Sequence, residues 1–198
     1  MESETTYKKG LKLEELFARH MKDKLGYDKI RVRAHLPGQD NAKGTEADIL
    51  ARKSNDIKEM AEYLVLPSLL IGVASALLAF FDIISDVSII SLCSDIIFPI
   101  SAVVFIISFI VNQLLNWEWT WVECKNLKGQ ANINQVSKLV REYEDYNNVE
   151  NKEFNITNLI FVSANGFIEN AIKYAEKKDI KCYQLNDKEE FTESKYWS

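Results

Sequence analysis

The feature that most constrains this chain is a long stretch without any lysine or arginine. No basic residue occurs from Glu59 to Val122, although the segments on both sides are rich in charges of both signs. Two apolar runs, 64–81 and 96–115, lie inside the stretch and contain no charged residue. Each has about the length that a bilayer-spanning helix requires. The pattern predicts a two-helix transmembrane hairpin, because a chain of 198 residues has little room to bury two such helices in a globular core.

The charges next to the two runs predict the orientation of this hairpin. Arg52, Lys53 and Lys58 precede the first run, and Lys125 and Lys128 follow the second, whereas the connecting segment carries no basic residue. Basic residues favour the cytoplasmic side of a membrane. We therefore expect a multi-pass protein of the cell membrane with both termini in the cytoplasm.

The segments outside the insert alternate between helical and strand-like patterns. Apolar residues recur every three to four positions in the expected helices, and they alternate with polar residues or run continuously in the expected strands. The expected helices are 8–25, 132–146 and 168–178, and the expected strands are 30–36, 45–52, 120–125, 158–163 and 180–185. The order α-β-β-β-α-β-α-β predicts an α/β domain with a mixed sheet. This domain would comprise residues 1–58 and 117–198, interrupted by the transmembrane insert 59–116, with a loose polar tail at its end.

The first candidate for chemistry is a glutamate and lysine pair on the strand after the insert. Side chains two positions apart in a strand point to the same face, so Glu123 and Lys125 lie together while Cys124 faces the other way. A carboxylate can hold a hard cation, and a neighbouring ammonium can stabilise charge on a phosphate. The Glu-x-Lys pattern alone is weak evidence, because it also occurs on solvated strand faces.

A second pair of acids lies on the strand before the insert. Glu46 and Asp48 share one face of that strand by the same periodicity. If this strand pairs with the strand of Glu123, Asp48 and Glu123 approach each other, and such proximity is costly unless a cation lies between them. The alternative is two exposed acids at the edge of a sheet.

These motifs, taken in order, resemble the Mrr-type restriction endonuclease-like branch of the PD-(D/E)XK nucleases. The resemblance is carried by a helix with Gly10 and Glu14 (GLKLEELFARHMKDKLGY), a glycine-containing turn before Asp48 (GTEADI), the ECK tripeptide, and a tail with a Gly-Phe turn (NLIFVSANGFIENAIKYAEKKDIKCYQL). The resemblance covers essentially all of the chain outside the insert. The core of the family has no such insert. The resemblance implies a restriction endonuclease-like fold.

The resemblance also implies roles for individual residues. Asp48 and Glu123 would coordinate Mg²⁺, for which Mn²⁺ is a substitute, and Lys125 would assist the attacking water. Glu14 would complete the acidic cluster, with an exposed helix carboxylate as the alternative, and Gln135 matches a position that is often polar in related active sites. Glu46 departs from the glycine-rich approach to the aspartate in relatives; it either competes for the metal or points to water.

The function that the resemblance implies is a membrane-anchored endonuclease. It would hydrolyse DNA phosphodiester bonds at the cytoplasmic face, in defence against foreign DNA. Two alternatives stay open: a nuclease-like module without chemistry that binds DNA or a protein partner, and a membrane effector whose hairpin oligomerises. The expected partners are DNA, the lipid bilayer through 64–81 and 96–115, and a second copy of the chain in a homodimer.

Other reaction classes lack their motifs. No GxGxxG or GxxxxGK[ST] loop is present, so the sequence does not indicate use of dinucleotides or nucleoside triphosphates. The two histidines, His20 and His35, have no triad-like arrangement with a serine or cysteine. Hydrolysis through a covalent intermediate is therefore not expected.

Overall fold

The structure is a computed structural model that describes residues 2–85, 88–114 and 117–196. Its internal contacts divide the chain into two compact units. One unit comprises Met1–Lys53 and Trp117–Ser198, and the other comprises Ser54–Asn116. We call the first the α/β unit and the second the helical unit, and describe each by itself.

The α/β unit is built on one six-stranded sheet whose strands follow each other in sequence order. The strands are β1 (Tyr27–Leu36), β2 (Thr45–Lys53), β3 (Glu118–Lys125), β4 (Asn155–Ser163), β5 (Ile180–Leu185) and β6 (Phe191–Ser194). Pairing is antiparallel among the first three strands, parallel from β3 to β5, and antiparallel again between β5 and β6. The sheet is therefore mixed, as the sequence predicts.

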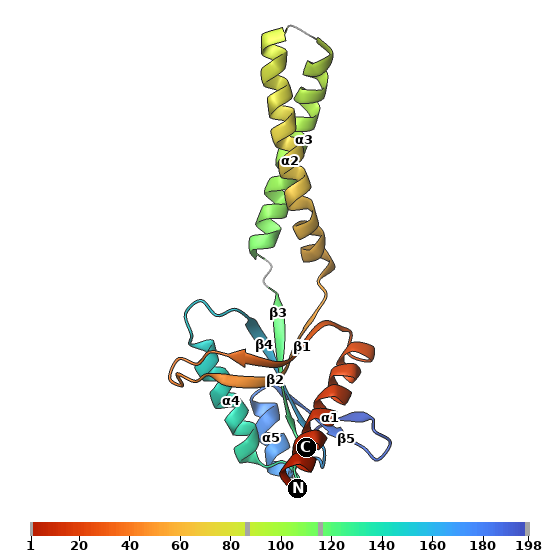
Figure 1. Ribbon diagram of the computed structural model, residues 1–198, viewed down its shortest axis with the longest axis vertical. Coiled ribbons are helices and arrows are strands. Elements are labelled where there is room, and N and C mark those ends of the chain that lie inside the picture. Colours follow the sequence, from red (N-terminus) through yellow and green to blue (C-terminus); the bar gives the residue numbers. More distant parts are fainter. Residues whose placement is uncertain (1, 86–87, 115–116, 197–198) are drawn as a thin grey trace. The chain divides into compact units, whose positions relative to one another are not determined.

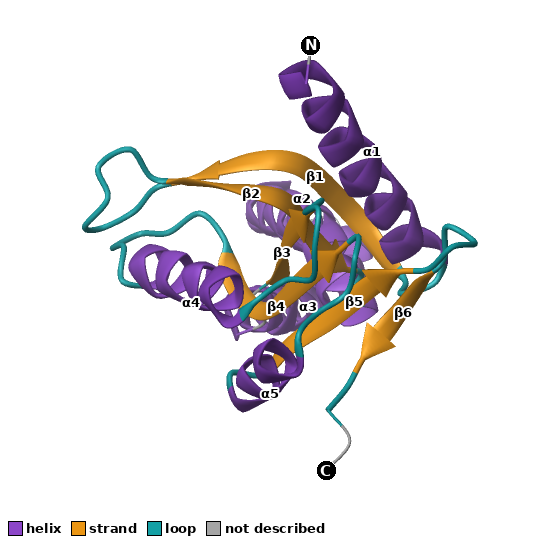
Figure 2. Cartoon of the chain, turned by 90° about the horizontal axis from the view of Figure 1, so that it is seen from below, coloured by secondary structure: helices purple, strands orange, loops and turns teal. Residues whose placement is uncertain are grey.

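Three helices cover the two faces of this sheet (Figure 2). Helix α1 (Glu2–Asp23) covers one face, and α4 (Ile133–Asn147) and α5 (Glu169–Lys177) cover the other. Because side chains alternate along a strand, β1 to β5 contribute to both cores. On β3, Val122 packs in the core under α1, whereas Trp121 packs in the core under α4 and α5.

The core under α1 depends on apolar residues at helical spacing. Leu13, Phe17 and Met21 recur every four residues and are buried. The ring of Phe17 meets those of Tyr183 and Phe191 with centroids 5.4 and 4.8 Å apart. Burial of each such side chain contributes about 1.5–3 kcal/mol, which fixes α1 against the sheet.

The start of α4 is fixed by a capping box. The Asn132 side chain accepts a hydrogen bond from the backbone N–H of Gln135, and the Gln135 side chain accepts one from the backbone N–H of Asn132. Together they satisfy N–H groups that have no partner within the helix. The helix then buries Val136, Leu139 and Val140 against the sheet.

The helical unit consists of α2 (Asp56–Ser85) and α3 (Ser88–Leu114), which pack along each other (Figure 1). Many of its apolar side chains are exposed, including Leu70 and Ile100. Gly72 permits close packing, since a Cβ there would lie 3.3 Å from the Ser101 hydroxyl.

The expected transmembrane hairpin is wrong. Among residues 2–85, 88–114 and 117–196, no helix combines the length and the apolar character needed to cross a membrane. The first apolar run, 64–81, belongs to a helix whose opening turns carry acids and a lysine. The second, 96–115, includes several polar residues, and its last residue lies outside the described residues. The same finding contradicts the expected placement as a multi-pass protein of the cell membrane with both termini in the cytoplasm. Contact with a bilayer through 64–81 and 96–115 stays a prediction. Residues 86 and 87, in the connecting segment, lie outside the described residues.

The expected loose tail is also wrong in part. Phe191–Ser194 forms β6, which pairs with β5. Phe191 is buried against α1, so a single apolar residue fixes this short strand to the core. A strand of four residues is too short to be distinguished from a loop by its pattern of apolar residues alone.

Candidate functional site

The pairing of β2 with β3 brings Asp48 next to Glu123. The antiparallel register joins Ile49 to Val122, so one step further along the strands Asp48 lies opposite Glu123. The Asp48 side chain also contacts β3, because its Oδ2 accepts a 2.7 Å hydrogen bond from the backbone N–H of Cys124. The predicted pairing of the two strands that flank the insert is confirmed.

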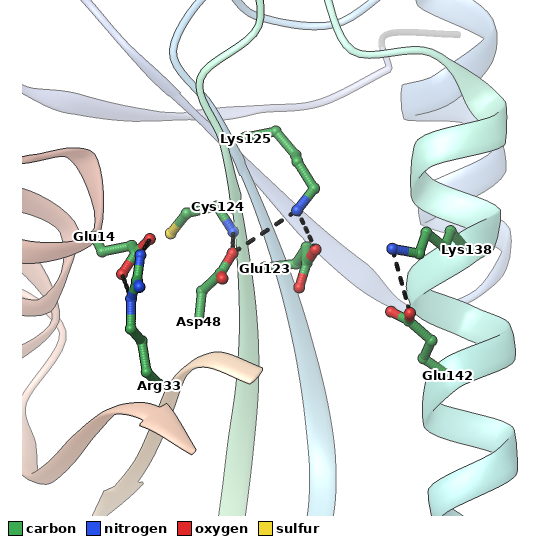
Figure 3. A network of polar contacts seen from close by, with 8 residues as sticks. All are labelled: Glu14, Arg33, Asp48, Glu123, Cys124, Lys125, Lys138 and Glu142. Atoms are coloured by element: carbon green, nitrogen blue, oxygen red, sulfur yellow. Dashed lines mark hydrogen bonds and ion pairs between the residues drawn. The ribbon is translucent and has the colours of Figure 1, made fainter. Parts of the chain in front are cut away.

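Lys125 joins the same group of side chains. Its ammonium forms an ion pair with Oε1 of Glu123 and lies 4.0 Å from Oδ2 of Asp48 (Figure 3). Strand periodicity places Glu123 and Lys125 on the face that α4 covers, while Cys124 packs in the core under α1. We call Asp48, Glu123 and Lys125 the central cluster.

Burial sets the protonation of Glu123. Its side chain is only 7% exposed. Loss of solvent and, to a smaller extent, the charge of Asp48 raise the pKa of Glu123 from 4.5 to about 7, although the Lys125 ammonium opposes both effects. Near neutral pH this carboxyl group therefore exchanges readily between its two forms.

The other two members of the central cluster respond to the same environment. Burial raises the pKa of Asp48, and the hydrogen bond from Cys124 opposes the rise. Burial alone would lower the pKa of Lys125, but the adjacent Glu123 carboxylate raises it above its ordinary value. Lys125 thus keeps its charge, so one cation faces two carboxyl groups that are hard to ionise together.

The chemistry of these donors fits a divalent cation. Oε2 of Glu123 is buried and has no hydrogen-bond partner among the residues that the structure describes. A buried carboxylate oxygen without a partner is costly. A hard cation held by Glu123 and Asp48 would satisfy this oxygen and favour the ionised form of both carboxyl groups, whose pKa values burial raises.

Glu14 takes part in a different interaction. Its carboxylate accepts two hydrogen bonds from Arg33, at 3.0 Å from Nε and 3.1 Å from Nη2. Within the described residues no group of three or more histidine, cysteine or acidic side chains is arranged to hold a metal ion. Glu14 is buried, which differs from the exposed helix carboxylate considered as its alternative.

The remaining sequence candidates lie outside the central cluster. The Gln135 oxygen serves the capping box of α4. Glu46 is exposed and pairs in register with His35 on β1. Glu46 therefore points to water, one of the two options that the sequence left open.

Three charged residues near the central cluster were missed by sequence reasoning. Arg33, on β1, pairs with Glu14 on the Asp48 side of the cluster, and Lys138 and Glu142 lie on α4 on the Glu123 side, with an ion pair of 3.4 Å (Figure 3). Glu142 also raises the pKa of Glu123 by its charge, although burial and Asp48 act more strongly. The spacing of Lys138 and Glu142 from Gln135, three and seven positions, places all three on one face of α4 and was the available signal.

Comparison with known proteins adds no relative. No family model, curated protein or solved structure matches this chain.

Proposed function

We propose that this protein is a metal-dependent nuclease that hydrolyses phosphodiester bonds in DNA. The observation that carries the proposal is the central cluster. Two carboxyl groups lie side by side on paired strands, that of Glu123 buried with one unpartnered oxygen and that of Asp48 partly buried, and an ammonium lies beside them. A solvated sheet edge would not bury these groups. Their desolvation is costly, and a role in chemistry gives a reason to maintain it.

Each member of the central cluster has a distinct role in this proposal. Asp48 and Glu123 hold Mg²⁺ or Mn²⁺. Mg²⁺ keeps several waters and needs only one or two carboxylates in addition to substrate phosphates, so two acids are sufficient. When bound, the cation polarises a phosphoryl oxygen and makes water a stronger nucleophile. Lys125 donates hydrogen bonds to oxygens that gain negative charge as the phosphate is attacked.

The choice of DNA as substrate follows from the resemblance to the Mrr-type nucleases. The net charge of −5 disfavours broad electrostatic coating of nucleic acid. Binding would instead depend on a few cations close to the central cluster and on the metal itself, which supplies positive charge at the scissile phosphate.

The direct test is cleavage of supercoiled plasmid DNA by the purified full chain with Mg²⁺. We expect nicking that requires the metal and that Lys125→Ala reduces by about a thousandfold, because the charge stabilised in the transition state is lost. Lys188→Ala is the matched control, since Lys188 is an exposed lysine in the turn between β5 and β6.

Two results would contradict the proposal. One is an absence of cleavage by a folded protein with either cation, and the other is cleavage that Lys125→Ala leaves unchanged. DNA binding without cleavage, together with no calorimetric binding of Mg²⁺, would favour the alternative of a nuclease-like binding module.

A further inference from the structure

Arg33 occupies a row of charges that crosses three strands. Its neighbours Val32 and Ala34 pair with Ile49 and Ala47, so Arg33 lies opposite Asp48, which in turn lies opposite Glu123. A cation and two acids therefore follow one another across β1, β2 and β3. The guanidinium lies close enough to Asp48 for its charge to help lower the pKa of that carboxyl group, and it pairs with Glu14 of α1 on the Asp48 side of the central cluster (Figure 3).

The backbone of Arg33 departs from the strand around it. Its φ of 56° lies in the left-handed region, which is uncommon for residues other than glycine. Such conformations are costly, and they concentrate at binding and catalytic sites, where the surrounding structure holds them in place.

Glu14 holds the Arg33 side chain in place. Two parallel hydrogen bonds join its carboxylate to Nε and Nη2 of Arg33, which fixes the plane of the guanidinium as well as its position. The Glu14 side chain is 7% exposed and that of Arg33 is 32% exposed. The acid is thus the buried partner, and the arginine is the one that reaches solvent.

Both oxygens of Glu14 are used in this pair, which makes it a poor metal ligand. The pair uses N–H groups on two of the three guanidinium nitrogens. The planar arrangement of these donors matches the oxygens of a phosphate. The site also needs such a cation, since two carboxyl groups would otherwise repel an anionic substrate.

We propose that Arg33 contacts a backbone phosphate of the nucleic acid at the central cluster, and that Glu14 is a positioning residue that orients Arg33 rather than a ligand of the metal. The inference rests on the proposed function for its substrate class. It adds a substrate contact and changes the role that the sequence suggested for Glu14.

Arg31 offers a matched control on the same strand. Its guanidinium lies over the rings of Trp119 and Phe154, 5.6 and 5.1 Å from their centroids, and it forms an exposed ion pair with Glu153. These contacts indicate a packing role at some distance along β1 from the central cluster. Arg31→Ala removes the same charge from the same strand without removing the proposed contact.

The first experiment measures binding of fluorescently labelled duplex DNA by the full chain in Ca²⁺, with anisotropy as the readout. We expect Arg33→Ala to weaken binding about tenfold and to lower the slope of log affinity against log salt by about one, because one phosphate contact is lost. Arg31→Ala should stay within about threefold of the parent. Arg33→Lys keeps the charge but lacks the planar donors, so its affinity for DNA should lie between those of the two alanine variants.

The second experiment separates positioning from metal binding at Glu14. We expect Glu14→Gln to leave Mg²⁺ affinity, measured by calorimetry without DNA, within about twofold, while KM for DNA rises several-fold because Arg33 is less well oriented. A tenfold loss of Mg²⁺ affinity in a folded Glu14→Gln protein would make Glu14 a ligand and overturn its positioning role. Thermal unfolding of each variant shows that it is folded.

The outcomes also distinguish this inference from the proposed function. Cleavage and DNA binding that Arg33→Ala leaves unchanged would reject the Arg33 contact and leave the nuclease standing. Binding that depends on Arg33, without any cleavage in Mg²⁺, would keep the contact and reject the nuclease. A folded parent protein that does not bind DNA in Ca²⁺ would overturn both.

Discussion

The two units of this chain use apolar residues in opposite ways. In the α/β unit, Leu50 and Trp121 are completely buried between the sheet and its helices. In the helical unit, Leu70 is 61% exposed and Ile100 is 58% exposed. Two helices can bury only the stripes that face each other, whereas a sheet between helices buries side chains on both of its faces. The comparison shows that the number of layers, more than apolar content, determines which residues form a core.

The largest expected effect tests whether chemistry belongs to the α/β unit alone. Asp48→Asn should reduce DNA cleavage by about a thousandfold, because the variant loses a charged ligand of the proposed cation. Ser108→Ala, a change at a buried polar position of α3, should leave the rate within about twofold. Plasmid nicking rates measure both. Equal losses in the two variants would contradict a division of roles between the units.

A matched pair of leucines tests the difference in burial. Leu50→Ala should lower the free energy of unfolding by about 2–5 kcal/mol, through lost burial and the cavity that it leaves. Leu70→Ala should change it by less than about 0.5 kcal/mol, since that side chain is largely exposed already. Denaturant unfolding followed by circular dichroism measures both. Similar losses at the two positions would mean that Leu70 is buried in solution by contacts that this chain alone does not provide.

A smaller effect concerns pH and sharpens the description of the central cluster. Because the folded pKa of Glu123 is raised to about 7, the unfolded chain loses its proton first as pH rises. Without divalent cations, the contribution of Glu123 to stability is complete below pH 4.5 and is lost as pH rises to about 7. Unfolding free energies from pH 4 to 8 should therefore decline, and Mg²⁺ should reduce the decline by favouring the ionised form.

Glu123→Gln provides the control for this pH dependence. The amide does not titrate, so the slope between pH 5 and 7 should flatten in the variant. An unchanged slope would assign the pH dependence to other groups and weaken the case for a raised pKa at Glu123.

The smallest expected effect lies at the border of the site. Lys138 and Glu142 form an ion pair one helical turn apart, and the lysine side chain is 59% exposed. Lys138→Ala should lower stability by about 0.3–0.5 kcal/mol, and by less at high salt, because solvent and ions screen such pairs. Thermal unfolding at two salt concentrations measures this. A loss comparable to that of Leu50→Ala would show that the pair is more than a surface contact.

Local pattern was sufficient for the elements that carry the central cluster. The two-residue period placed Glu123 and Lys125 on one face, and the strand Ile180–Leu185 was predicted with its observed bounds. The approach of Asp48 to Glu123 followed from a single assumption, that the strands flanking the insert pair with each other. These features depend on neighbours in sequence or on one pairing, and such features are the most accessible to sequence reasoning.

The rest depended on contacts that no local pattern encodes. The role of Arg33 requires a left-handed backbone and a buried partner, Glu14, nineteen positions away. Gln135 could not be assigned, because the same residue type serves a helix cap as readily as an active site. The wrong prediction of a transmembrane hairpin had a similar origin. The apolar content of a stretch of sequence does not give the residues at which a helix begins and ends, and α2 and α3 have bounds that differ from those of the two apolar runs.

The separation of Asp48 and Cys124 by 76 positions has a consequence for the order of folding. The other paired strands are separated by shorter segments with at most one helix each, whereas β2 must wait until two helices and β3 have been synthesised. Contacts between distant parts of a chain form slowly, because the loop must close before they are gained. An incomplete chain on the ribosome therefore contains Asp48 without its partner and cannot assemble the central cluster. The proposed nuclease activity would therefore require that β3 has emerged from the ribosome.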